Sequence, residues 1–442
     1  MKKFWTIPNI IYTVLFCLIA NGSVFVFKNL LTLVFIIPFL VFLFGFGGIS
    51  TLKTKKKRLK VCYHGGVLLT IFAVSLPVSA FYHTVLAFRL LPDNYKSFML
   101  STLFCVLIEG TLFLVGIVCV YCTSVQLGVE MRIKGLVCCM IPVWNLWLLQ
   151  KMIVITMNEV KVEVEKEQLN QQRKHDAICK TKYPLLLVHG VFFRDVNLFN
   201  YWGRIPRELT LNGATIYYGR HQSAASVADS AKELNRRIRQ IVEDTGCEKV
   251  NIIAHSKGGL DSRYAISVLG AAPYVASLTT INSPHRGCMF VDYLMKNAPN
   301  IVKDKIAVAY NSAMRKLGDE NPDFIAAVTD LTAEACEKRE ELLTYPEGVF
   351  CQSVGSVQNK ASNGKFPMNY SYHIVKYFDS QSDGIVGESS FAWGERYQLI
   401  TVKGDRGVSH ADMIDFTRNN IEEFDVREFY VQLVSDLRQR GL

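Results

Sequence analysis

The residues best suited to chemistry lie in the run Ile252-Ile253-Ala254-His255-Ser256-Lys257-Gly258-Gly259. An apolar β-rich run enters this segment, a serine follows it, and paired glycines open a helix. A strand, a sharp turn and a helix in this order present a serine hydroxyl at the edge of a sheet. The backbone packs closely there, so small residues are needed two before and two after the serine. Gly258 meets this need, and Ala254 stands where glycine is more usual. The run predicts that Ser256 is a catalytic nucleophile.

A second segment, Leu187-Val188-His189-Gly190-Val191, ends the first strand of the same half of the chain. When a serine attacks a carbonyl, the oxyanion that forms needs two backbone N–H donors that converge on one point. We predict that these donors are the amides of Val191 and Lys257, the second of which directly follows the serine. His189 precedes the serine and lies inside the turn, which favours a structural role over that of a catalytic base.

A nucleophilic serine also needs a histidine that accepts its proton. In a strand–serine–helix architecture the chain order is serine, then acid, then histidine. Three histidines follow the serine, namely His285, His373 and His410. His410 comes after the last β-rich run, where a base would reach over the edge of the sheet. It is the predicted base.

The acid that orients the histidine has three candidates before His410. Asp383 lies in an Asp-Gly turn that follows the predicted strand Ile374–Phe378. Asp379 and Asp405 are the competing acids, and Asp405 is close to His410 in sequence. The turn chemistry and the order of the strands favour Asp383.

These motifs resemble those of bacterial triacylglycerol lipases of the α/β-hydrolase superfamily. The resemblance spans about residues 183–437 and leaves out the N-terminal part. It implies that Ser256 is the nucleophile, Asp383 the acid and His410 the base, with the amides of Val191 and Lys257 as oxyanion donors. It is carried by the segments Tyr183–Gly190, Tyr201-Trp202, Ala254–Gly259, Thr280–Gly287, Ser382–Val386 and Ser409–Asp412.

The resemblance also bears on cofactors. Several such lipases hold a structural calcium ion near the catalytic histidine, and Asp412 matches one ligand position. Phe416 stands where the next side-chain oxygen is expected, so the resemblance implies no required cofactor and leaves Asp412 as a lone candidate ligand. The region Gly287–Thr332 corresponds to a lid in lipases of this kind, with an ordinary pair of capping helices as the alternative.

The elements that must position these residues begin after Lys182, where β-rich runs alternate with helical ones. This alternation predicts an α/β-hydrolase domain over residues 183–442, with a mostly parallel sheet covered by helices. The predicted strands are Leu185–Val188, Thr215–Tyr218, Lys249–Ala254, Leu278–Ile281, Val349–Val354, Ile374–Phe378 and Gln398–Val402. The predicted helices are Ala225–Thr245, Gly258–Gly270 and Phe424–Leu437.

The first 157 residues are mostly apolar and predict an α-helical, multi-pass transmembrane region that precedes the hydrolase domain. A helix needs about 20 apolar residues to cross a bilayer core. Residues 158–182 are polar and read as a linker or stalk helix, and Glu109 is either a functional group or a neutral glutamate between helices. Five runs reach spanning length: Ile7–Phe27, Leu30–Ile49, Gly65–Phe88, Phe98–Tyr121 and Gly135–Met157.

Lysine and arginine counts in the short loops predict the orientation. The loop Lys53–Lys60 carries six of these residues and should be cytoplasmic. Five crossings then place the catalytic domain on the extracytoplasmic side of the cell membrane. The orientation reverses if Gly135–Met157 lies in the interface instead of crossing.

The distribution of charge excludes a nucleic-acid partner. The formal net charge is +10, but residues 1–157 hold 14 Lys/Arg against 3 Asp/Glu, whereas the rest hold 35 against 36. The positive excess therefore sets membrane topology and offers no basic groove. The five cysteines of residues 158–442 are irregularly spaced and predict neither a disulfide framework nor a zinc site.

Taken together, the motifs predict a membrane-anchored serine hydrolase that cleaves carboxylic esters of lipids through an acyl-enzyme. Its partners would be a lipid or ester substrate and the membrane. Two alternatives stay open: transfer of acyl groups between lipids by the same triad, and a catalytically inactive membrane scaffold.

Overall fold

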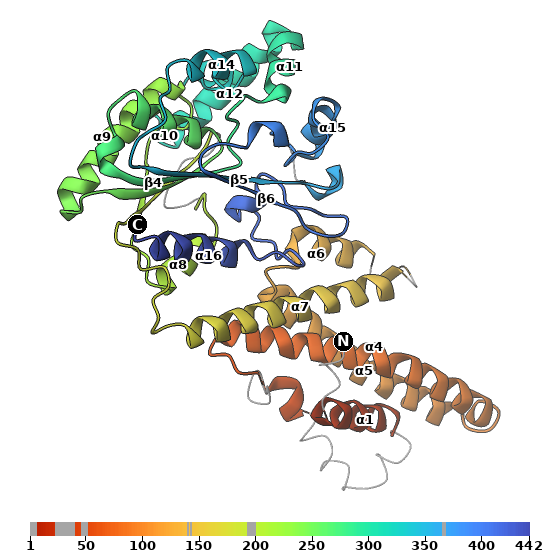
Figure 1. Cartoon of the computed structure of the whole chain (residues 1–442). Coiled ribbons are helices and arrows are strands. Elements are labelled where there is room, and N and C mark those ends of the chain that lie inside the picture. The colour runs from red at the N-terminus through yellow and green to blue at the C-terminus, as the bar shows by residue number, and fades with distance from the viewer. Residues whose placement is uncertain are drawn as a thin grey trace. The chain divides into compact units, whose positions relative to one another are not determined.

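The computed structural model describes residues 7–22, 40–45, 52–138, 141, 144–191, 200–364 and 368–442. The chain divides into two compact units, Met1–Gln172 and Arg173–Leu442 (Figure 1). The division falls inside the predicted linker 158–182. Helix α7 (Trp144–Gln172) covers the first part of that range and ends where the first unit ends.

The second unit is built on one six-stranded sheet in the order β2-β1-β3-β4-β5-β6, and every neighbouring pair is parallel. In a parallel sheet the carboxyl ends of all strands lie at one edge. The chain adds β2 on one side of β1 and β3 on the other, so the order reverses there, and ligands bind at such a switch point. The strands are β1 (Leu185–Val188), β2 (Ile216–Tyr218), β3 (Val250–His255), β4 (Val275–Ile281), β5 (Phe350–Ser356) and β6 (Arg396–Ile400).

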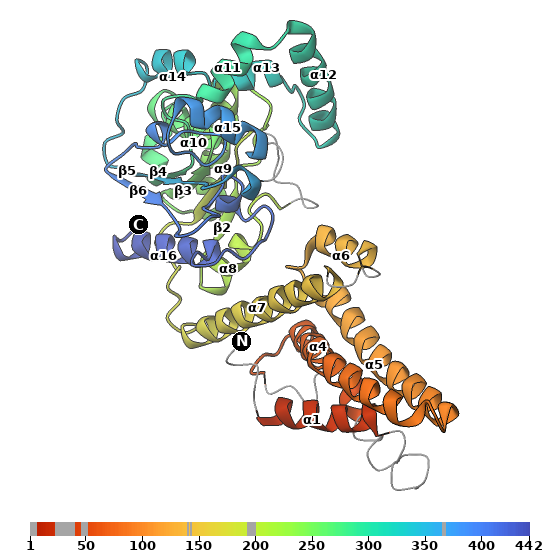
Figure 2. The ribbon, with the colours of Figure 1, turned by 90° about the vertical axis from the view of Figure 1, so that its right-hand side faces the viewer.

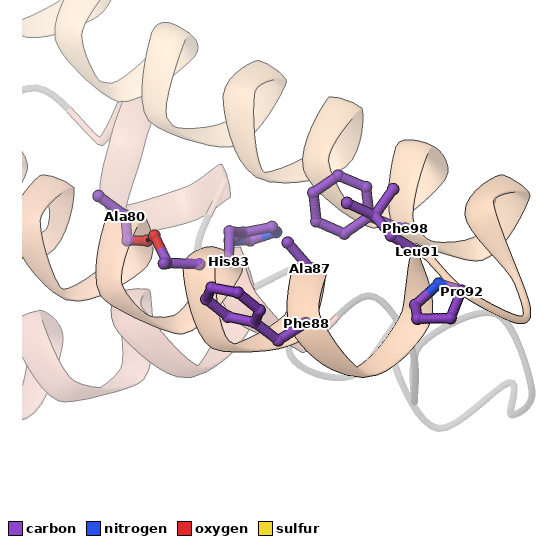
Figure 3. Close-up of a pocket in the computed structure, with 8 residues that line it drawn as sticks. Ala80, His83, Ala87, Phe88, Leu91, Pro92 and Phe98 are labelled. Atoms are coloured by element: carbon purple, nitrogen blue, oxygen red, sulfur yellow. Dashed lines mark hydrogen bonds between the residues drawn. The ribbon is translucent and has the colours of Figure 1, made fainter.

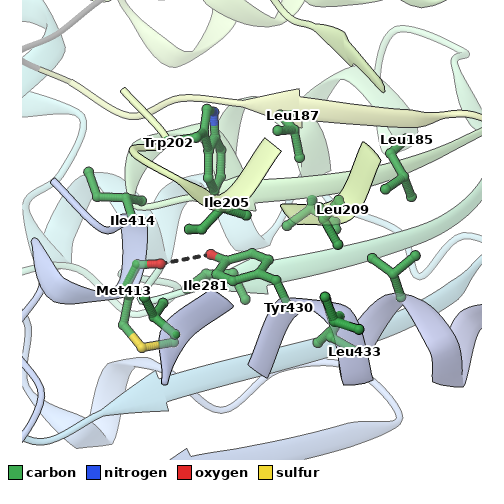
Figure 4. Packing of buried hydrophobic residues seen from close by; sticks show 14 of the residues in the cluster. Leu185, Leu187, Trp202, Ile205, Leu209, Ile281, Met413, Ile414, Tyr430 and Leu433 are labelled. Atoms are coloured by element: carbon green, nitrogen blue, oxygen red, sulfur yellow. Dashed lines mark hydrogen bonds between the residues drawn. The ribbon is translucent and has the colours of Figure 1, made fainter. Parts of the chain in front are cut away.

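Helices cover both faces of this sheet (Figure 2). Leu185 and Leu187 of β1 point to one face, where they pack with α8 (Ile205–Leu211) and α16 (Val426–Gln439) (Figure 4). Leu186 and Val188 point to the other face and pack with α9 (Val227–Thr245) and α10 (Lys257–Ser267). A strand that is apolar on both sides is typical of a parallel sheet between two helical layers.

One predicted strand is wrong. Ile374–Phe378 belongs to helix α15 (Met368–Phe378). The β-branched and aromatic residues of this run favoured a strand. The buried residues Met368, Tyr372 and Val375, however, recur at the three-to-four-residue spacing of a helix.

The predicted lid region Gly287–Thr332 contains three helices, α11 (Met289–Asn297), α12 (Asn300–Lys316) and α13 (Phe324–Thr329). A fourth helix, α14 (Ala333–Glu340), follows directly. Several apolar side chains of α11 and α12 are exposed. That these helices move as a lid remains a prediction. Single 3-10 turns complete the unit at Ala272–Tyr274, Ala361–Asn363, Glu388–Ser390 and Asp412–Ile414.

The described part of the first unit is helical. Two of its helices, α4 (Lys57–Leu90) and α5 (Tyr95–Thr123), are long and apolar enough to cross a membrane. Two such helices suggest a membrane association only weakly. The apolar part of α1 (Ile7–Asn21) is shorter. Most of the predicted span Leu30–Ile49 lies outside the described residues.

The predicted span Gly135–Met157 is not one helix. Helix α6 (Gly128–Val137) ends inside it, and α7 begins at Trp144. In the sequence this run contains Pro142 and Asn145 among its apolar residues, and that mixed polarity had left open whether it crosses the membrane or lies in the interface.

A mainly apolar pocket with a volume of about 590 Å³ lies in the first unit, at the ends of α4 and α5 that their short connection joins (Figure 3). His83 is the one titratable residue among those that line it. Farther along the same helices, Ser75 and Ser79 of α4 each donate a hydrogen bond to Glu109 of α5 at 2.9 Å.

Candidate active site

Ser256 occupies the turn between β3 and α10. Its backbone has φ 56° and ψ −130°, a conformation that residues other than glycine rarely adopt and that concentrates at functional sites. The amide of Ser256 donates to the carbonyl of Ile281 at the end of β4, at 2.9 Å. Only about 7% of Ser256 is exposed, so the turn holds the serine in a nearly closed environment at the carboxyl edge of the sheet.

Two glycines allow the segments around the serine to approach one another. A Cβ atom at Gly190 would lie 2.8 Å from the Cβ of Ser256, and one at Gly258 would collide with the carbonyl oxygen of His189. The loop after β1 therefore presses against the start of α10, across the switch point of the sheet. This contact brings Val191 and Lys257, the predicted oxyanion donors, to the same edge.

The amide of Lys257 suits that role on its own terms. Lys257 is the first residue of α10, and the N–H groups of a first helical turn have no partner within the helix. The positive end of the helix dipole also favours a developing negative charge there.

The structure brings the predicted acid and base together. The Nδ1 atom of His410 lies 2.6 Å from Oδ2 of Asp383. Asp383 is fully buried, and its Oδ1 accepts hydrogen bonds from the amides of Ile385 and Val386 at 2.9 and 2.8 Å. These donors fix the carboxylate as an acceptor, which is the state that orients a histidine and stabilises its charged form.

His410 also lies against the residue that precedes the predicted nucleophile. Its ring centroid lies 4.4 Å from that of His255, the residue before Ser256. Because Nδ1 is bonded to Asp383, Nε2 is the nitrogen left to take a proton. Ser256 and His410, both described, form no hydrogen bond with each other in this structure. Such bonds are often long without substrate and tighten when substrate binds.

The competing acids have other partners. Asp379 accepts hydrogen bonds from the amide and hydroxyl of Ser389 at 3.0 and 2.7 Å. Asp405 is exposed and pairs with Lys360 at 2.7 Å. The error in predicting Ile374–Phe378 as a strand does not affect the choice of Asp383. Helix α15 ends where that strand was expected to end, just before the Asp383 turn.

The other histidines that the sequence offered also have other surroundings. His285 is buried, with its ring nitrogens 2.9 Å from the Thr280 hydroxyl and 3.2 Å from Arg263. His373 is exposed on α15. His189 is fully buried, and its ring nitrogens lie 2.9 and 3.1 Å from the backbone carbonyl oxygens of Gly190 and His221.

The side chain of Lys257 lies in a buried network behind the serine turn. Its Nζ atom donates to Asp261 at 2.8 Å and to Ser230 of α9 at 2.9 Å. The other oxygen of Asp261 lies 3.6 Å from Nε2 of His221. Burial, followed by the neighbouring His189, lowers the pKa of His221 to about 4. The Lys257 side chain thus ties α10 to α9.

Three residues of the site had no predicted role. Asn282, whose φ is 49°, donates to Oδ2 of Asp383 at 2.7 Å. Tyr201 and His255 form a hydrogen-bonded path between Gly190 and His410. All three stand in segments that carry the family resemblance. Their partners, however, are distant in sequence, and no spacing predicts those contacts.

Asp412 does not fit a calcium site. Its Oδ2 accepts hydrogen bonds from the amide and hydroxyl of Ser409 at 3.0 and 2.7 Å, and its Oδ1 lies 3.1 Å from the Arg406 guanidinium. These contacts complete a turn, and a cationic side chain already neutralises the carboxylate. Among the described residues no cluster of three or more His, Cys, Asp or Glu is placed to hold a metal ion.

Comparison with known proteins finds lipases. The chain is 34% identical over 169 residues to triacylglycerol lipases of Pseudarthrobacter phenanthrenivorans and Burkholderia plantarii, covering 36% of this chain and 52% and 47% of those proteins. It thus spans about half the length of these two relatives. A triacylglycerol lipase of Vibrio cholerae is 27% identical over 289 residues, covering 60% of this chain and 90% of the relative. No family model matches the sequence.

Solved structures of lipases are also similar. The Staphylococcus hyicus lipase matches with a TM-score of 0.47 and 18% identity, over 59% of this chain and 97% of that one. The mature Bacillus licheniformis lipase BlEst2 matches with a TM-score of 0.44 and 21% identity, over 57% and 92%. The parallel sheet with its covering helices is an α/β fold, and the relatives that these comparisons find are triacylglycerol lipases.

Proposed function

We propose that the chain is a serine hydrolase that cleaves carboxylic esters of lipids through an acyl-enzyme. The contact of 2.6 Å between His410 and Asp383, beside the strained turn that carries Ser256, is the observation that supports it best. The triacylglycerol lipase relatives support lipid esters as the substrate class.

The proposed reaction has two halves. The Oγ atom of Ser256 attacks the ester carbonyl carbon while Nε2 of His410 takes the hydroxyl proton, and the amides of Val191 and Lys257 stabilise the oxyanion. The intermediate collapses, His410 returns the proton to the leaving alcohol, and an acyl-enzyme remains. Water then attacks the acyl carbon, gives its proton to His410, and the fatty acid leaves as Ser256 regains the proton.

We also propose that the first unit anchors the enzyme in a membrane as a multi-pass region. Helices α4 and α5 are its best-supported spans, and the cluster of positive charge at Lys53–Lys60 favours the cytoplasmic side for that loop. The extracytoplasmic placement of the second unit requires an odd number of crossings. It loses the support of a continuous fifth span, because α6 and α7 divide Gly135–Met157.

A reporter fused after Leu442 decides the sidedness. If a reporter that functions only outside the cytoplasm is active, the second unit lies on the extracytoplasmic side. If a reporter that functions only in the cytoplasm is active, the chain crosses the membrane an even number of times and the extracytoplasmic placement is wrong.

The enzymatic proposal is tested with the full-length protein in detergent. Release of fatty acid is measured from emulsified triacylglycerol, from phosphatidylcholine vesicles and from a short-chain p-nitrophenyl ester, with and without an added alcohol. We expect wild-type release from at least one ester and a loss of at least about 1,000-fold in Ser256→Ala. Equal release by Ser256→Ala contradicts the proposal. An acylated alcohol in place of fatty acid assigns acyl transfer, and no turnover of any ester favours a scaffold.

A further inference from the structure

A path of hydrogen bonds joins the oxyanion loop to the loop of the catalytic histidine. The amide of Gly190 lies 3.0 Å from the hydroxyl of Tyr201, and that hydroxyl lies 2.7 Å from Nδ1 of His255. Nε2 of His255 lies 3.2 Å from the carbonyl oxygen of His410. The path therefore starts beside Val191, passes the residue before Ser256 and ends at the predicted base.

The chemistry of the groups fixes the direction of each bond. A carbonyl oxygen only accepts, so Nε2 of His255 donates to His410. A neutral imidazole then accepts at Nδ1, which leaves the hydroxyl of Tyr201 as the donor to His255 and as the acceptor for the amide of Gly190. His255 is fully buried, and burial lowers its pKa well below the ordinary value, in agreement with a neutral ring.

We propose that Tyr201 is a positioning residue that sets the Val191 amide for the oxyanion, an inference that rests on the proposed ester hydrolysis. Gly190 has no side chain with which to pack, so the hydrogen bond from its N–H to the Tyr201 hydroxyl directly holds this end of the loop. The tyrosine is itself held, because only about 3% of it is exposed and its ring lies against His255, with centroids 5.8 Å apart.

The expected consequence is kinetic. Loss of one oxyanion donor costs about 100- to 1,000-fold in kcat, and an error of about 1 Å in position can cost 100-fold. Removing the Tyr201 hydroxyl leaves Val191 in the chain but frees the residue before it. Tyr201→Phe should therefore lower kcat by about 10- to 100-fold, with KM within about twofold, because an oxyanion donor acts chiefly in the transition state.

The same apolar cluster supplies a matched control. Tyr430 of α16 is also buried in it, and its hydroxyl donates to the carbonyl of Met413 at 3.0 Å (Figure 4). Tyr430→Phe removes one buried hydroxyl from the same core without touching the path from Gly190 to His410. It should leave kcat and KM within about twofold of wild type.

The experiment compares Tyr201→Phe, Tyr430→Phe, Ser256→Ala and wild type as full-length proteins. It measures kcat, KM and the melting temperature with a soluble p-nitrophenyl ester, together with the rate of labelling by a fluorophosphonate, whose phosphoryl oxygen occupies the oxyanion position. We expect kcat and the labelling rate to fall together in Tyr201→Phe and to stay near the wild-type values in Tyr430→Phe. This contrast should hold even if the two variants have the same melting temperature.

The outcomes separate the two proposals. If Ser256→Ala is inactive and Tyr201→Phe matches Tyr430→Phe in kcat and labelling, the role of Tyr201 is overturned and the hydrolase stands. If Tyr201→Phe raises KM alone, Tyr201 acts on substrate binding and the inference is wrong. If Ser256→Ala retains turnover, the proposed function fails first.

Discussion

The two units both bury carboxylates, but they surround them differently. In the first unit, Glu109 accepts hydrogen bonds from Ser75 and Ser79. Glu159 of α7 accepts from Arg58 of α4 at 2.6 Å and from the Ser124 hydroxyl at 2.7 Å. Each carboxylate joins one helix to its neighbours, and its partners are hydroxyl, amide and guanidinium groups that do not titrate near neutral pH.

In the second unit, Asp383 has backbone and amide donors as well, but one of its partners is His410. The other ring nitrogen of that histidine is not bonded to Asp383, and the ring lies against His255, the residue before a serine on a strained turn. A buried carboxylate alone therefore does not mark a candidate reaction site. The second unit adds a histidine partner and, close to it in the fold, a serine on a strained turn.

The largest expected effect comes from removing the charge of Asp383. Asp383→Asn should lower kcat by about 1,000- to 10,000-fold, because the histidine loses the partner that sets its tautomer. The matched control is Asp405→Asn, which removes an exposed carboxylate near His410 in sequence and should stay within about twofold. Steady-state hydrolysis by the full-length proteins measures both. A crippled Asp405→Asn beside a mild Asp383→Asn would reverse the assignment of the acid.

The next effect concerns stability in the second unit. Asp261→Asn leaves the buried ammonium of Lys257 without its counter-charge, and breaking a buried pair costs about 3–5 kcal/mol of unfolding free energy. Asp229→Asn breaks the exposed pair with Lys232 in α9, where the cost should stay below about 1 kcal/mol. Denaturant unfolding of both variants checks the contrast. Equal losses would show that burial does not set the strength of these pairs.

A smaller effect follows from His221, whose pKa is about 4 in the folded state against an ordinary 6.5. Below pH 6.5 the imidazole of His221 is protonated in the unfolded chain but not in the folded chain. The free energy of unfolding therefore decreases as the pH is lowered from about 6.5 to about 4. From pH 7 to pH 5 this group should remove about 2 kcal/mol.

Replacing the ring tests that account. The free energy of unfolding is measured by denaturant unfolding at pH 7 and at pH 5 for wild type and His221→Gln. The variant should lose less stability between the two pH values than wild type does, and the difference should equal the contribution of His221 given above. An unchanged pH slope would mean that His221 is not the group that resists protonation.

The smallest expected effect tests the first unit. Glu109→Gln keeps a side-chain oxygen that accepts from Ser75 or Ser79 but removes the carboxylate. Hydrolysis of a soluble ester should stay within about twofold of wild type, because the proposed reaction uses no group of α5. A loss comparable to that of Asp383→Asn would break the contrast between the units and give Glu109 a part in the reaction.

The sequence predicted the second unit better than the first. Leu185–Val188 and the serine turn were correct, because a short apolar run before a turn, a serine and paired glycines allow few alternatives. Ile374–Phe378 was wrong because composition was given more weight than the spacing of Met368, Tyr372 and Val375. In Gly135–Met157 the overall hydrophobicity was given more weight than the polar residues inside the run, although helix α6 ends there and α7 begins.

The candidate site was predictable to the level of motifs. The turn of Ser256 and the chain order of Asp383 and His410 come from local patterns, and the fold brings the last two within 2.6 Å. The contacts of Tyr201 and Asn282 join segments far apart in the chain. Only the folded sheet brings such residues to one edge, so no spacing in the sequence could predict them.

The proposed function depends on Ser256 being a nucleophile that His410 activates, and covalent labelling examines that step itself. The full-length protein is treated with a fluorophosphonate, and the modified residue is located by peptide mass spectrometry. We expect one modified serine, Ser256, with labelling at least about 100-fold slower in His410→Ala. Labelling at another residue, or labelling of Ser256 at the same rate in His410→Ala, would contradict it.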